Sequence, residues 1–170
     1  CVVEYGGHTQ NANIYFANAN PVINNSTIRF SSSDGIYLSN SSPAIDNNTI
    51  TNNSNYGISG NIYSAGFITD NTLSDNGQAA INIHPSAAGR VSGNSGSGNG
   101  QDLIRVYGGE LRANSTWVKQ ELPFGITGDI TVSSWDFSDH SNPCSVTLTI
   151  EPGVQIRFNP GDRKSTRLNS

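Results

Sequence analysis

The chain has 170 residues, of which 34% are hydrophobic and 13% are charged. This length suits one domain or two small ones, and a formal net charge of −4 without any basic stripe argues against a nucleic-acid interface. No apolar run is long enough to cross a bilayer as a helix, so the sequence predicts no membrane span.

The apolar residues recur at steps of 22 or 23 residues. Disordered low-complexity chains need no such period, so the pattern indicates a repeat architecture. Three columns of aliphatic residues keep their register: Ile14, Ile36, Ile58, Ile81 and Ile104; Ile23, Ile45, Ile68 and Val91; and Ile28, Ile50 and Leu73.

In chain order, the repeats contain short segments in which apolar and polar residues alternate. This period of two is typical of a strand with one buried face, and the abundant Asn, Gly and Ser are poor helix formers. Each repeat is therefore predicted to be a few very short strands joined by polar turns. The alternating pairs are Ile14/Phe16, Ile36/Leu38, Ile81/Ile83 and Ile104/Val106.

One such repeat cannot bury its apolar side alone, but stacked repeats can. The sequence therefore predicts an all-β fold, a parallel β-helix with one coil of 22–23 residues per repeat. Ser26, Asn48, Asn71 and Asn94 fall at one position of successive coils. We expect them to adopt the left-handed turn conformation that Asn tolerates and to form a ladder of side-chain hydrogen bonds.

The motifs "PVINNSTI", "PAIDNNTI" and "GFITDNTL" carry a resemblance to a known family. Over residues 1 to about 106 the chain resembles the right-handed parallel β-helix repeats of secreted and surface bacterial proteins, in the pectate-lyase-like superfamily. That superfamily includes lyases, hydrolases, adhesins and inert stalks. The resemblance thus implies an extracellular or cell-surface location, and it leaves the activity open.

The chain is predicted to contain two β-helix units and a foreign tail. The first unit covers residues 1–112, and residues 113–161 begin a second, tandem module. A continuous β-helix with a long insertion at residues 108–145 is the alternative. Residues 162–170, "DRKSTRLNS", resemble a translated sequencing adapter, so we expect an artefact there and a fragment of a longer protein.

The charged and thiol-bearing residues predict no catalytic residue, no cofactor and no metal site. The turn acids do not gather on one face, and we interpret them as solvated side chains. The histidines have no Cys or His partner at ligand spacing, which favours surface positions. We expect no disulfide between Cys1 and Cys144. The acids are Asp34, Asp46, Asp70, Asp75 and Asp102, and the histidines are His8, His84 and His140.

An outward column is the strongest candidate for binding. If Ile14 and Ile36 point inward, then Tyr15 and Tyr37 point outward one coil apart, with Ser59, Asn82 and Arg105 below them. Aromatic rings beside amide and guanidinium groups suit a sugar chain, so Tyr15, Tyr37, Asn82 and Arg105 form a hypothetical glycan site. The alternative is an aromatic pair that only stiffens the sheet.

We therefore expect a non-catalytic structural or adhesive segment of a secreted or surface protein, with a polysaccharide or cell-surface glycan as partner. The alternative is a polysaccharide lyase or glycoside hydrolase whose active-site coils lie outside this chain. Other hypotheses are a trimeric viral fibre and an ice-binding face on the column Thr27, Thr49, Thr72 and Ser95.

Overall fold

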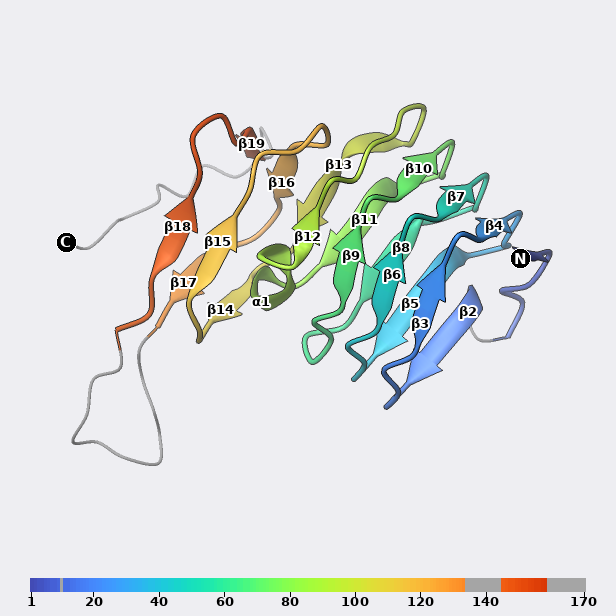
Figure 1. Ribbon diagram of the computed structural model, residues 1–170, viewed down its shortest axis with the longest axis horizontal. Helices are drawn as coiled ribbons and strands as arrows, with labels where there is room; N and C mark the ends of the chain where they lie inside the picture. The colour runs from blue at the N-terminus through green and yellow to red at the C-terminus, as the bar shows by residue number, and fades with distance from the viewer. Residues whose placement is uncertain (10, 134–144, 159–170) are drawn as a thin grey trace.

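A computed structural model describes residues 1–9, 11–133 and 145–158. The prediction of an all-β parallel β-helix is confirmed: short strands stack in parallel, coil on coil, along the long axis of the molecule (Figure 1). Residues 162–170 and Cys144 lie outside the described residues. Cys1 is an exposed free thiol.

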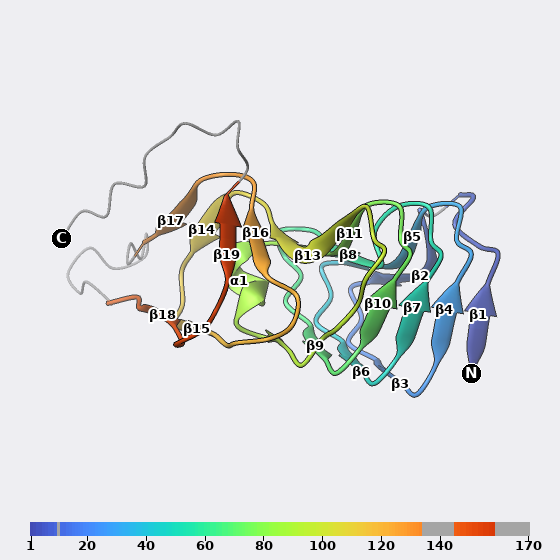
Figure 2. The ribbon, with the colours of Figure 1, turned by 90° about the horizontal axis from the view of Figure 1, so that it is seen from above.

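Three parallel sheets, named here sheets A, B and C, form the sides of the coils (Figures 1 and 2). Sheet A contains β1 (Val2–Glu4), β4 (Thr27–Arg29), β7 (Thr49–Thr51) and β10 (Thr72–Ser74). Sheet B contains β2 (Ala12–Ala17), β5 (Asp34–Ser39), β8 (Ile58–Gly60), β11 (Ala79–Ile83), β13 (Gln101–Val106), β16 (Phe124–Ile126) and β19 (Ile156–Phe158). Sheet C contains β3 (Val22–Asn24), β6 (Ala44–Asp46), β9 (Phe67–Thr69) and β12 (Val91–Ser92).

Two further strand pairs and a short helix complete the described elements. The pairs are β14 (Gly109–Leu111) with β17 (Ile130–Val132), and β15 (Ser115–Trp117) with β18 (Leu148–Ile150). The helix α1 (Pro85–Ala88) was not predicted. Pro85 supplies a pre-set helical φ at the first position, and the His84 ring accepts a hydrogen bond from the Ser86 backbone N–H.

The aliphatic columns lie in the register that the repeat predicts. Ile36 pairs with Ile58, and Ile58 pairs with Ile81. The Ile45 and Ile28 columns pair in the same way, and their members in the inner coils have no exposed surface. Burial of each such side chain contributes roughly 1.5–3 kcal/mol, so the stacked coils share one dry axial core.

A ladder of buried amides runs parallel to this core. The Asn71 Nδ2 donates to Asn94 Oδ1 at 3.0 Å and to the Ile45 carbonyl at 2.9 Å. In turn, Asn71 Oδ1 accepts from both the backbone N–H and the Nδ2 of Asn48, and Asn48 Oδ1 accepts from the Ser26 N–H. Each amide therefore satisfies a backbone N–H and a carbonyl of the preceding coil as well as its neighbour in the ladder.

A second amide ladder, which the repeat alignment missed, lies at the corner that follows sheet A. Its members are joined by the same bonds, with Asn53 Nδ2 and Asn76 Nδ2 donating at 2.9 Å to the next Oδ1. Asp102 ends this ladder, because its carboxylate accepts from the side chain and backbone N–H of Asn99. Desolvation raises the pKa of Asp102, but these hydrogen bonds outweigh it and hold the pKa below its usual value.

The expected left-handed backbone does not lie on the ladder residues themselves. It lies one position earlier, at Asn25, Asn47, Asp70 and Gly93. The expectation was wrong for a physical reason. The left-handed residue turns the chain, whereas the next side chain must point inward to reach the backbone groups at the corner.

Sheet B crosses the predicted boundary between the two units. β16 pairs with β13 in register, with Ile104 opposite Phe124 and Val106 opposite Ile126. Trp117 stacks on Phe124 with ring centroids 4.8 Å apart, so the aliphatic core becomes aromatic at this point. Both units thus share one sheet, and the division at residue 112 stays a prediction.

We predict that Asn71→Ala lowers the free energy of unfolding by about 3 kcal/mol, because it leaves several buried donors and acceptors without partners. Asn47→Gly is the matched control, since Asn47 belongs to an exposed pair with Asn25 and glycine keeps the positive φ. Urea denaturation followed by circular dichroism measures both. Equal losses in the two variants would contradict a special role of the buried ladder.

Candidate functional site

The outer face of sheet B carries the predicted column of binding residues. Tyr15 pairs with Tyr37, Tyr37 with Ser59, Ser59 with Asn82, and Asn82 with Arg105. Parallel strands lie about 4.8 Å apart, so the column runs along the solenoid axis with one side chain per coil. Ser59 is the buried member of this column.

The two tyrosines form a stacked pair at one end of the column. Their ring centroids are 5.4 Å apart with an interplanar angle of 14°. Tyr15 keeps 39% of its surface exposed, and Tyr37 is half-buried. The pair therefore presents aromatic surface to solvent from a rigid backbone.

Arg105 lies at the other end and is held by two neutral acceptors. Its Nη1 donates to the Tyr56 hydroxyl at 2.7 Å and to Asn82 Oδ1 at 3.3 Å. Among the described residues, no carboxylate lies within salt-bridge distance of Arg105. The guanidinium is thus a half-buried, fixed group of N–H donors.

Tyr107 lies beside the column, directly after the last residue of β13. Its hydroxyl donates at 2.8 Å to the carbonyl of Gly60, a residue that belongs to the coil two positions earlier in the chain. Its ring packs edge-on against the His84 ring, with 5.8 Å between the ring centroids. Burial, together with the neighbouring Tyr37, raises the pKa of Tyr107 to about 12. Tyr56 and Tyr107 therefore both bridge coils along the axis, one on each side of the central column.

Asp34 belongs to this face, and the expectation that it is a solvated turn acid was wrong. It is only 6% exposed. Its Oδ1 accepts from the Tyr56 backbone N–H at 3.2 Å, and its Oδ2 accepts from the Ser59 hydroxyl. Burial raises the pKa of Asp34, and these two hydrogen bonds oppose the shift without reversing it. Asp34 therefore positions Ser59 and Tyr56.

The surface position expected for His84 was also wrong. His84 is buried at the start of α1, where its Nδ1 lies 2.8 Å from the Ser86 hydroxyl. Burial lowers the pKa of its imidazole. His84 contacts the site through the Tyr107 ring. His8 is exposed, and His140 lies outside the described residues.

The other predicted acids lie apart from this face. Asp46 accepts from the Thr69 hydroxyl on the outer side of sheet C, and Asp70 and Asp75 occupy left-handed corners. Within residues 1–9, 11–133 and 145–158, no three His, Cys, Asp or Glu side chains group as metal ligands would. In the same ranges, no helix has the length and apolar character of a membrane span.

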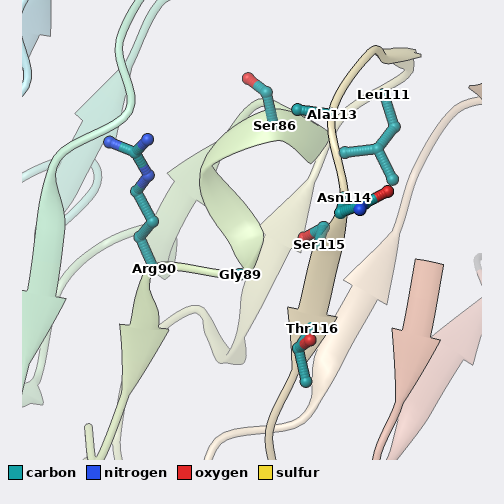
Figure 3. A pocket seen from close by; sticks show the side chains of 8 residues that line it. All are labelled: Ser86, Gly89, Arg90, Leu111, Ala113, Asn114, Ser115 and Thr116. Atoms are coloured by element: carbon teal, nitrogen blue, oxygen red, sulfur yellow. The ribbon is translucent and has the colours of Figure 1, made fainter. Parts of the chain in front are cut away.

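A hollow of about 260 Å³ lies elsewhere, between α1 and the segment from β14 to β15 (Figure 3). The buried Ser115 hydroxyl lies directly against Gly89 at the edge of this hollow and, among the described residues, has no hydrogen-bond partner. Arg90 points away from the hollow (Figure 3) and donates instead to the Ala65 carbonyl at 2.9 Å. The lining therefore lacks converging charged groups.

Sequence reasoning placed the central column correctly and missed the residues that support it. Alternation within a strand predicts which side chains point outward, as for Tyr15 and Tyr37. It does not show that Tyr56 and Tyr107 extend along the axis to reach other coils. A further indication was available, since "SDG" at the start of β5 and "NYG" just before β8 align in the repeat and bring Asp34 next to Tyr56.

Comparison with known proteins gives one result. A family model described as a right-handed β-helix region matches residues 12–150. This match covers the strands of the three sheets except β1 and β19, and it includes the boundary that the sequence suggested near residue 112. No curated protein and no solved structure matches the chain.

We predict that Asp34→Asn stabilises the fold at neutral pH. The folded-state pKa of Asp34 is raised, so its contribution to stability is present below the unfolded-state pKa and is lost as pH rises through the folded-state value. Asparagine can keep both hydrogen bonds, with Oδ1 accepting and Nδ2 donating to Ser59. Urea midpoints measured across acidic to neutral pH should converge at low pH and favour the variant at neutral pH.

Tyr107 should ionise late in an alkaline titration of the folded protein. Because its pKa is raised to about 12, its contribution to stability is complete below the unfolded-state value of 10.0 and is lost as pH rises from there. Tyrosinate absorbance during an alkaline titration measures this ionisation. Tyr107→Phe should remove the latest phase and cost about 1 kcal/mol of stability through the lost bond to Gly60. A titration unchanged by the substitution would contradict the assignment.

Proposed function

Because the chain belongs to the right-handed β-helix family, we propose that it is a non-catalytic, rigid segment of a secreted or cell-surface protein that holds a polysaccharide on the outer face of sheet B. A stacked solenoid suits such a role, since its length and stiffness come from repetition of one unit. The partner is a surface or matrix glycan.

The observation that carries the proposal is the stacked, solvent-facing pair Tyr15 and Tyr37 in one column with Asn82 and Arg105. Aromatic rings contact the C–H faces of sugars, and amide and guanidinium groups hydrogen-bond to the hydroxyls. One side chain per coil repeats at about 4.8 Å along the axis, so an extended sugar chain lying along the column meets several contacts in succession.

The supporting residues favour binding over cleavage. Asp34 is the acid of this face, but it is buried and both of its oxygens already accept hydrogen bonds. Arg105 is fixed by Tyr56 and Asn82, which reduces the entropy lost when a ligand binds. The face therefore offers preorganised contacts to a ligand. The Asp34 carboxylate lies beneath these contacts and is too buried for a bound ligand to reach directly.

The test replaces both tyrosines. Tyr15→Ala/Tyr37→Ala should clearly weaken retention of the protein in native gels that contain a soluble β-glucan, a galactomannan or a polyuronate, with little change in its melting temperature. Tyr63→Ala is the matched control, because Tyr63 is an exposed tyrosine on the loop between β8 and β9. Equal retention of the double variant and the parent would refute the proposed face.

A further inference from the structure

A second pair of aromatic residues occupies a backbone position that disfavours them. Tyr5 and Phe30, the residues that follow β1 and β4, have φ angles of 63° and 56°. In the next coils the same corner carries Asn52, Asp75 and Gly98, which also have positive φ. The corner thus requires a left-handed residue in every coil, and only the first two coils place aromatic residues there.

This choice costs stability. The left-handed conformation costs roughly 1–2 kcal/mol for a residue with a bulky side chain, whereas Asn, Asp and Gly adopt it more readily. Moreover, 75% of the Tyr5 surface and 38% of the Phe30 surface stay exposed, so burial does not offset the cost. Strained positions of this kind concentrate at functional sites.

The two rings form an ordered surface with a charged pair beside them. Their centroids are 5.4 Å apart at an interplanar angle of 21°. The Arg29 guanidinium lies 5.0 Å from the Phe30 centroid, and Arg29 Nε donates to Glu4 at 2.7 Å. Tyr5 and Arg29 both contact the Phe30 ring, and Tyr5 is the more exposed of the two rings.

This combination suits a pyranose sugar. A flat exposed ring accepts the C–H face of the sugar, while a carboxylate and a guanidinium next to it offer an acceptor and donors for adjacent hydroxyl groups. The ion pair also keeps the local charge balanced, which favours a neutral ligand over an anionic one.

We propose that Tyr5, Phe30, Arg29 and Glu4 form a second carbohydrate-binding site, at the corner that follows sheet A. It uses none of the residues of the column on sheet B, so it extends the proposed function and does not depend on it. The two sites give the first two coils separate contacts for sugar chains on different sides of the solenoid.

The test substitutes the residue that the next coil uses at this corner. Tyr5→Asn/Phe30→Asn should relieve the strained backbone and raise the melting temperature, while it weakens binding to a soluble β-glucan or galactomannan by about tenfold. The melting temperature therefore rises while the affinity for the polysaccharide falls. A misfolded variant would instead show a lower melting temperature together with weaker binding. Tyr5→Phe keeps the ring and should retain binding.

Phe67→Asn is the matched control. Phe67 is exposed and lies under Arg90, with 5.2 Å between the guanidinium and the ring centroid, but its backbone is ordinary strand. Unchanged binding in Tyr5→Asn/Phe30→Asn, or an equal loss in Phe67→Asn, overturns the second site. Binding measured in the Tyr15→Ala/Tyr37→Ala background separates the two proposals, because the second site predicts a residual affinity there that the asparagine substitutions remove.

Discussion

The fold depends on how the buried backbone groups at the corners of each coil are satisfied. Columns of aliphatic side chains supply the hydrophobic stabilisation. At a corner, however, the chain changes direction next to the core, and its backbone N–H and C=O groups have no partners within a strand ladder. The two amide ladders solve this, because each Asn donates to a carbonyl of the preceding coil and accepts from its backbone N–H. A buried unsatisfied group costs about 1–3 kcal/mol, so the ladders are as necessary as the isoleucines.

Because the aliphatic columns and the amide ladders stabilise the fold, the outward positions of sheet B can differ from coil to coil. The aliphatic columns and the ladder amides repeat from coil to coil, whereas the outward column of sheet B changes from Tyr37 to Asn82 to Arg105. Side chains on that face then interact along the axis, as Tyr56 does with Arg105 and Tyr107 with Gly60. These contacts join coils that are far apart in sequence and make the face one rigid surface.

The same distinction explains what the sequence could predict. Period and alternation determine which residues stack and which point outward, so the core and the Tyr15–Tyr37 pair were predictable. The direction of a long side chain on the outer face is set by its neighbours in other coils, and thus the bond from Arg105 to Tyr56 was not. The burial of Asp34 depends on the same neighbours. The ladder through Asn53 and Asn76 follows the same repeat period as the column from Ser26 to Asn94, so the period alone could have predicted it.

The first two coils depart from the repeat at several surface positions. The first two coils contain the two stacked aromatic pairs that keep solvent-exposed surface, and the second coil also contains the buried Asp34. At the left-handed corner that follows sheet A, the next coil has Asn52, so the fold does not require an aromatic residue there. Next to Tyr37, a buried carboxylate is retained where an amide could make the same hydrogen bonds. The positive φ angles of Tyr5 and Phe30 and the burial of the Asp34 carboxyl each lower stability, and these residues lie on the coils that also carry the two exposed aromatic pairs. The glycan proposed as a partner, in contact with these coils, would account for that coincidence.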